Sequence, residues 1–270
     1  NTEPAWTKAP ADLKDEDYNN FYRELYPMNF EDPIFHIHLN VDYPFNLTGI
    51  LYFPKLKNNL EVQKNKINLY SNQVFITDNV ENIVPEFLTL LHGVIDSPDI
   101  PLNVSRSYLQ SDHNVQKISN HIQKKVADRL ERMYKEDRAD YEQKWEDIRV
   151  FIEYGMLTQE KFNEKMDKCY LLKDNEGKFH TVEEYKAKVE VLQKDKNGKV
   201  VMLYTHDQEE HHALIQQAKN RGYDVVLMDS PLSSHILMKL ESKHNDISFV
   251  RVDSNSVDKL IDKGEDVPSK

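Results

Sequence analysis

An arginine near the expected start of a helix is the residue of this sequence whose surroundings best suit an anion. Arg106 directly follows Ser105, and either Ser105 or Asn103 could cap a helix that begins there. The N-terminus of a helix already carries partial positive charge, so an arginine at this point is unfavourable unless an anion comes close to it. From the residues alone, a solvated arginine remains the simpler interpretation.

Histidines are grouped at two places where a metal site is the first chemistry to consider. His206 and His211 lie five residues apart, whereas the two zinc ligands of an HExxH helix are four apart and share a face. We therefore expect a solvated helix start capped by Thr205. His36 and His38 share one face of an expected strand, but no third ligand is identifiable nearby. A stand-alone metalloenzyme built on this pair is the lesser alternative to two polar-face histidines without a metal.

The remaining candidate groups give no sign of an active site of their own. Cys169 is the only cysteine, which excludes a disulfide within the chain and fits a reducing compartment. No histidine is partnered with it in the sequence, so we expect an inert thiol. The seven glycines form neither the GxGxxG fingerprint of dinucleotide sites nor a GxxxxGKS/T phosphate loop. We expect no nucleotide pocket in this chain.

Length and composition bound the class of protein. A chain of 270 residues that is 39% hydrophobic and 30% charged should fold, and its length predicts two packed units. The net charge of -11 gives no overall positive field that would gather nucleic acid, and no apolar run approaches the roughly 20 residues that cross a bilayer. The sequence begins without an initiator methionine or a signal peptide, so we expect a piece of a longer protein.

Hydrophobic patterns in the first half of the chain predict the framework that positions Arg106. Apolar and polar residues alternate over 35–41, and the run 47–53 is apolar on both faces, which predicts a hairpin. A further strand pair is expected within 68–77. From Asp112 onward, apolar residues recur at spacings of three and four as far as Met133, which predicts an amphipathic helix capped by Asp112.

The second half of the chain alternates helices and strands. Helices are expected over 135–146 and 148–157, the second ending near Gly155, and Thr181 with Glu184 forms a capping box for another helix. Strands and helices then alternate over 200–204, 206–221, 225–228, 232–242 and 247–252. Such alternation predicts right-handed βαβ crossovers and a parallel sheet.

The predicted fold class is therefore α/β. We expect a larger three-layer α/β/α unit over residues 1–135, a short helical connector over 136–170 and a smaller α/β/α unit over 171–252. Residues 253–270 are rich in acidic side chains and lack a core pattern, so we expect them to form a linker.

One long string of residues resembles a known family signature. Residues 93–110 are Gly-Val-Ile-Asp-Ser-Pro-Asp-Ile-Pro-Leu-Asn-Val-Ser-Arg-Ser-Tyr-Leu-Gln. This string is similar to the middle-segment signature of the 90-kDa heat-shock chaperone family, in its bacterial form, and supporting matches occur at residues 6–10, 51–55 and 74–78. The resemblance implies a cytoplasmic, homodimeric, ATP-dependent chaperone. In it, this segment would lie between an N-terminal ATP-binding domain and a C-terminal dimerisation domain.

The resemblance gives Arg106 a specific role. The matching arginine of the family reaches the γ-phosphate of ATP, which is bound with Mg²⁺ by the N-terminal domain and not by the middle segment. Asn103 and Gln110 would be its polar companions on the same loop and helix. The chemistry is sound, because a guanidinium fork neutralises the charge on the oxygens of a transferring phosphoryl group.

The same resemblance implies two protein-binding surfaces. Phe75 would contact the N-terminal domain, whereas Trp6, Leu56 and Leu60 would contact non-native client proteins. An alternative without catalysis is a protein-binding module in which Arg106 is only structural.

Overall fold

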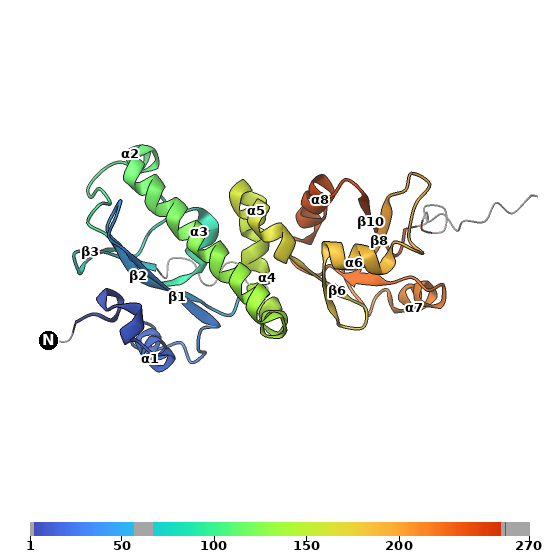
Figure 1. Ribbon diagram of the computed structural model, residues 1–270, viewed down its shortest axis with the longest axis horizontal. Helices are drawn as coiled ribbons and strands as arrows, with labels where there is room; N and C mark the ends of the chain where they lie inside the picture. The colour runs from blue at the N-terminus through green and yellow to red at the C-terminus, as the bar shows by residue number, and fades with distance from the viewer. Residues whose placement is uncertain (1–2, 57–66, 255–256, 258–270) are drawn as a thin grey trace, which may run out of the picture. The chain divides into compact units, whose positions relative to one another are not determined.

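The computed structural model describes residues 3–56, 67–254 and 257 of the chain. Two compact units, residues 1–162 and 163–270, are each built around a five-stranded sheet (Figure 1). The boundary falls inside the stretch that the sequence predicts as a separate connector, so most of that stretch is grouped with the first unit. No helix in the described part of the chain is long and apolar enough to cross a membrane.

The sheet of the first unit is mixed. Its strands lie in the order β1 (Phe35–Val41), β2 (Leu47–Phe53), β5 (His92–Asp96), β3 (Ile67–Ser71) and β4 (Val74–Thr77). Neighbouring strands are antiparallel except β5 and β3, which are parallel. The hairpin predicted over 35–41 and 47–53 is confirmed, and so is the strand pair within 68–77.

Helices cover both faces of this sheet, which confirms the predicted three layers. On one face, α1 (Asp15–Leu25) packs its aromatic side chains against β2 and β5. On the other face, α4 (Arg138–Thr158) places Phe151 on Phe53 of β2, with ring centroids 4.8 Å apart. The predicted amphipathic helix, α3 (His113–Glu136), contacts β1 and α4.

The helices predicted over 135–146 and 148–157 are one continuous helix, α4, which ends at Thr158, close to the predicted end, but Gly155 lies within it and does not end it. Gly155 is buried, and a Cβ atom built on it would lie 2.6 Å from the ring of Phe162 and 2.8 Å from that of Phe87. These rings belong to α5 (Glu160–Met166) and to the 3-10 helix η3 (Glu86–Leu90). The glycine therefore makes room for two aromatic rings and does not terminate a helix.

The second unit contains the predicted alternation of strands and helices. Its sheet has the order β10 (Ile247–Arg251), β8 (Val200–Thr205), β9 (Val225–Leu227), β6 (Leu171–Asp174) and β7 (Phe179–Thr181). The helices are α6 (Val182–Val189), α7 (His212–Asn220) and α8 (Ser233–Lys243). The prediction of a parallel sheet is confirmed for β10, β8 and β9, whereas β6 and β7 extend it with antiparallel pairing.

The helix predicted from residue 206 begins only at His212, because the residues before it form a turn. The hydroxyl oxygen of Thr205 accepts a hydrogen bond from the N–H of Asp207 at 3.1 Å and lies 2.8 Å from Nδ1 of His211. His211 is buried, with 5% of its surface exposed. The expected solvated helix start capped by Thr205 is therefore wrong, since this threonine holds a buried histidine inside a turn.

Candidate functional site

Three connections meet at one edge of the first sheet, namely the β1–β2 turn, the β3–β4 turn and the loop that follows β5. Because β3 and β5 are parallel, their carboxyl ends lie side by side, and Tyr70 is paired with Asp96 at that edge. The antiparallel strand β2 brings Thr48 opposite the same Asp96, so the turn between β1 and β2 reaches this edge as well. Ligand-binding loops are common at the carboxyl ends of parallel strands. The loop of residues 97–105 leaves β5 here and leads to Arg106.

Arg106 is the first residue of α2 (Arg106–Ser111), as the sequence predicts. Ser105 caps this helix, because its hydroxyl oxygen accepts a hydrogen bond from the N–H of Tyr108 at 3.2 Å. Asn103 is not the cap and instead has a φ angle of 58°, in the left-handed region that asparagine tolerates. The Arg106 side chain is exposed, and no hydrogen bond or ion pair joins it to another described residue. Its guanidinium is therefore available to an anion from outside the chain.

Gln110 lies four residues after Arg106, so the two side chains share one face of α2. The main-chain oxygen of Gln110 accepts a hydrogen bond from Nε2 of Gln116 at 3.1 Å, which ties the end of α2 to the first turns of α3. Gln110 also lines a surface pocket of about 400 Å³, together with Asn82 and Asn120. The structure thus groups Arg106 and Gln110 on α2, with Asn103 in the preceding loop.

Exposed apolar side chains occur on β4, in the loop before Arg106 and on α2. They are Val74, Phe75, Leu102, Val104 and Tyr108. Phe75 is 53% exposed, and its ring meets the edge of the Tyr70 ring at 5.7 Å between centroids. Solvated apolar side chains that are gathered in this way commonly mark a surface for another protein. The exposure of Phe75 leaves it available for the interdomain contact expected of it.

Trp6 and Leu56 are buried, which corrects the expectation that they face client proteins. Trp6 is 7% exposed, packs on Tyr70 with ring centroids 4.8 Å apart and donates its indole N–H to Asp96 Oδ2 at 3.0 Å. Leu56 is 3% exposed. An amphipathic ring with a buried carboxylate as its partner belongs to the core. Leu60, the third expected client contact, lies outside the described residues.

His36 and His38 on β1 face α1. The ring of Tyr18 stacks on His36 with centroids 3.7 Å apart, and its Oη lies 2.8 Å from Nδ1 of His38. Burial lowers the pKa of His36 to about 4 and also lowers that of His38, because a buried imidazole disfavours the charged form. Among the residues that the structure describes, no group of three or more histidine, cysteine or acidic side chains could hold a metal ion. These two imidazoles pack a helix onto a sheet.

Acid should weaken this packing. The pKa of His36 is about 4 in the folded chain and about 6.5 in the unfolded chain, so the unfolded chain binds more protons between these values. Stability should therefore fall as the pH drops from about 6.5 toward 4. His36→Phe keeps a ring against Tyr18 and cannot be protonated. We expect its Tm to fall less than that of the wild type between pH 7 and 4.5, measured by calorimetry. An equal fall of Tm in the wild type and in His36→Phe would contradict this prediction. His113→Gln, which replaces an exposed histidine, is the control, and its Tm should fall as that of the wild type does.

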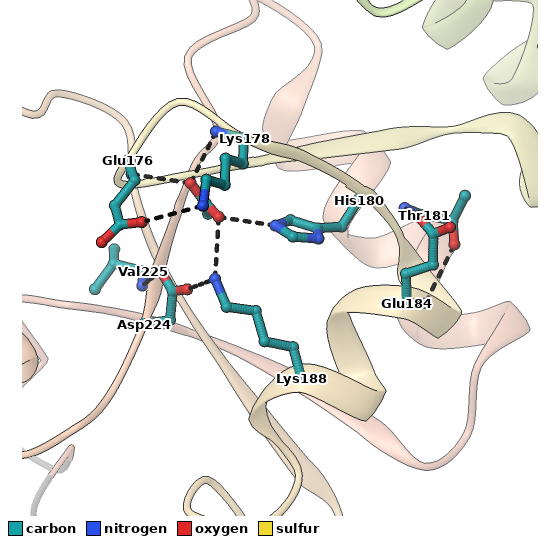
Figure 2. A network of polar contacts seen from close by, with 9 residues as sticks. Glu176, Lys178, His180, Thr181, Glu184, Lys188, Asp224 and Val225 are labelled. Atoms are coloured by element: carbon teal, nitrogen blue, oxygen red, sulfur yellow. Dashed lines mark hydrogen bonds and ion pairs between the residues drawn. The ribbon is translucent and has the colours of Figure 1, made fainter. Parts of the chain in front are cut away.

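A buried carboxylate organises polar contacts in the second unit (Figure 2). Asp174 Oδ2 lies 2.8 Å from Nε2 of His180 and accepts from Nζ of Lys188 at 3.0 Å, while two main-chain N–H groups of the β6–β7 turn donate to Oδ1 at 2.9 Å each. Burial would raise the pKa of this carboxyl, but the hydrogen bonds from His180, the turn and Lys188 lower it to about 2. Lys188 of α6 forms ion pairs with this carboxylate and with Asp224, and Figure 2 shows Lys188 reaching to Asp224. The chain's own donors satisfy Asp174, so its role is structural.

Asp174→Asn should destabilise the chain by about 2–3 kcal/mol at pH 7, because it removes the buried carboxylate from His180 and leaves Lys188 with Asp224 alone. The folded-state pKa of Asp174 is lowered to about 2, so its stabilisation is complete above about pH 4 and is lost as the pH falls toward 2. Urea unfolding at pH 7 and pH 3 should show the difference between variant and wild type shrinking in acid. Asp195→Asn is the matched control, since Asp195 accepts two main-chain bonds in a similar turn. An equal loss in both variants would contradict the role of the cations.

Comparison with known proteins gives a consistent relationship over nearly the whole chain. The Hsp90 protein family model matches residues 1–267. Chaperone protein HtpG of Porphyromonas gingivalis is 61% identical over 264 residues, which cover 98% of this chain and 38% of that protein. Chaperone protein htpG of Bacteroides fragilis is 58% identical over 269 residues, which cover 98% of this chain and 39% of that protein. The chain thus spans well under half the length of these relatives.

A solved structure has the same fold. The middle domain of a putative heat shock protein of Plasmodium falciparum matches 93% of this chain and 100% of that chain, with a TM-score of 0.69 at 20% sequence identity. This likeness concerns the fold, whereas the family match and the bacterial relatives concern the sequence itself. The chain therefore belongs to the Hsp90 protein family, in its bacterial HtpG type.

Proposed function

We propose that this chain is the middle segment of an ATP-dependent molecular chaperone and that Arg106 reaches the γ-phosphate of ATP held by a neighbouring N-terminal domain. The observation that carries the proposal is the exposed guanidinium of Arg106, which has no hydrogen-bond or ion-pair partner in the described part of the chain. An exposed arginine at a capped helix start, which no acidic side chain of the described residues pairs with, suits an incoming phosphate. The HtpG chaperones at 58–61% identity support the same assignment.

The residues on α2 suit phosphoryl transfer. ATP with Mg²⁺, both bound by the neighbouring domain, would supply the γ-phosphoryl group and neutralise part of its charge. Arg106 would donate N–H groups to the γ-phosphate oxygens, where negative charge is spread in the transition state. Gln110, on the same face of α2, would add a neutral donor, and the Ser105 cap would fix the backbone from which Arg106 extends. We expect no ATP hydrolysis by this segment alone.

The proposal includes partners of the whole protein. The exposed apolar side chains of β4, of the loop before Arg106 and of α2, among them Phe75, suit contact with the N-terminal domain of the same chain. The relationship to the HtpG chaperones supports the rest of the proposal. The whole protein would carry a C-terminal dimerisation domain, form a homodimer, bind non-native client proteins and act in the cytoplasm.

The exposed apolar side chains also favour a second candidate, a protein-binding module in which Arg106 takes no part in catalysis. The two candidates differ in one measurement, which is ATP turnover by the full-length protein with and without Arg106. A slower Arg106→Ala variant supports the catalytic proposal. Unchanged turnover would favour the binding module, and Phe75→Ala should then still weaken the association of the segment with its partner.

A further inference from the structure

The loop that leads to Arg106 is fastened at its base to the turn between β1 and β2. Ser97 Oγ donates a hydrogen bond to the main-chain oxygen of Asn46 at 2.6 Å. The N–H of Asn46 donates to Asp99 Oδ2 at 2.7 Å, and the N–H of Asp99 donates to Ser97 Oγ at 3.2 Å. Both main-chain groups of Asn46 are therefore held by side chains of the loop. We call these three residues the Asn46 clasp.

The clasp continues the sheet where regular pairing ends. The last pair between β2 and β5 is Thr48 with Asp96, and the chains would separate beyond it. Instead, the N–H of Ser97 donates to the main-chain oxygen of Tyr70 at 3.1 Å, and its side chain reaches across to Asn46. Ser97 is 1% exposed, so its own polar groups are shielded from water and a lost partner there is costly, whereas Asn46 is exposed. The base of the loop is thus fixed on both sides of β5.

The other end of the loop is fixed as well. Ser105 caps α2, and Gln116 ties the main-chain oxygen of Gln110 to α3. Ile100, just after the clasp, is 3% exposed. Between these fixed ends lie residues 101–104, and four residues reach at most about 14 Å. We expect a span this short to pass a shift at the clasp on to the start of α2.

We propose that Ser97 and Asp99 are positioning residues for Arg106: by holding Asn46, they set the place from which the guanidinium reaches the phosphate. This inference rests on the proposed function. Catalytic groups act only when they are held close to the reacting geometry, and small displacements caused by distant changes can lower rates by roughly a hundredfold. Ser97 and Asp99 need not touch the nucleotide, because they act through the loop.

Asp99 is the better position to test, because Ser97 is buried and its replacement also disturbs the sheet. In the full-length protein, Asp99→Ala should lower kcat for ATP hydrolysis about tenfold and leave KM for ATP within about twofold. Asp99→Asn keeps an acceptor oxygen for the Asn46 N–H and should restore most of kcat. Asp42→Ala, at an exposed carboxylate in the same β1–β2 turn, is the matched control and should retain wild-type kcat.

A second readout keeps the test independent of catalysis. Hydrogen exchange of the Asn46 amide, measured by NMR on the 270-residue chain, should accelerate in Asp99→Ala and recover in Asp99→Asn. Faster exchange together with lower kcat supports the proposal. Unchanged kcat in Asp99→Ala, with Arg106→Ala still slow, overturns the positioning role and leaves the proposed function standing. If Arg106→Ala itself turns over ATP normally, the proposed function and this inference both fall.

Discussion

ATP turnover by the full-length protein should fall at least about tenfold when Arg106 is replaced by alanine, while ATP binding stays nearly intact. Arginines that neutralise a transferring phosphoryl group contribute roughly 10³ to 10⁵ in rate in well-studied nucleotide hydrolases. Arg106 is exposed, and Ser105 caps the helix that begins at Arg106. Replacing the arginine side chain therefore disturbs no core contact. A lower kcat with an unchanged Kd for ATP would identify an interaction made in the transition state.

Two further variants sharpen this experiment. Arg106→Lys keeps the positive charge but loses the planar fork, so its kcat should lie between those of the wild type and Arg106→Ala. Arg132→Ala removes an exposed arginine from α3 and should retain wild-type turnover. If all three variants hydrolyse ATP at the wild-type rate, the arginine has no catalytic role.

Gly93→Ala should destabilise the first unit by at least about 3 kcal/mol. Gly93 has a φ angle of 130°, and a Cβ atom built there would lie 2.0 Å from the main-chain oxygen of Ile50 on the neighbouring strand. Its N–H also donates to the Oη of Tyr26 at 2.7 Å, a bond that a shifted strand would lose. Both the φ angle and the close approach of β2 exclude a side chain. Urea unfolding followed by circular dichroism measures the loss.

Gly198→Ala provides the control for the backbone conformation. Gly198 has a φ angle of 80°, but nothing lies within 4 Å of a Cβ atom built on it. This variant should lose only about 1–2 kcal/mol, the cost of a left-handed alanine. Equal losses at both positions would show that the contact with Ile50 is unimportant.

Local patterns predict much of the framework because its elements are amphipathic over several residues. The alternation in β1 and the three-and-four spacing in α3 each follow from one buried face, and both elements occur where the sequence predicts them. The same spacing is present in α1, at Tyr18, Phe21, Tyr22 and Leu25, and would have revealed that helix. Gly155 misled the prediction, since a glycine packed against rings cannot be distinguished locally from a helix terminator.

In the candidate site, too, only the contacts between residues close in the sequence could be predicted. The Ser105 cap is a contact over three residues and could be predicted, whereas the bond from Trp6 to Asp96 spans 90 residues and that from Asn46 to Asp99 spans 53. Such long-range partners depend on strand order, which no local pattern contains. For the same reason, a tryptophan expected at the surface is part of the core.

The bond between Trp6 and Asp96 also makes the intrinsic fluorescence of the chain sensitive to a partner that binds nearby. The carboxylate oxygen that accepts the indole N–H of Trp6 also accepts the N–H of Gln73 at 3.0 Å, in the turn just before Phe75. A partner that presses on Phe75 would shift this turn and change the polarity around the indole, and hence its emission wavelength. Trp145, the other tryptophan, is 1% exposed within α4 and supplies a steady background. Docking of a neighbouring domain could thus be followed by intrinsic fluorescence, without an attached dye.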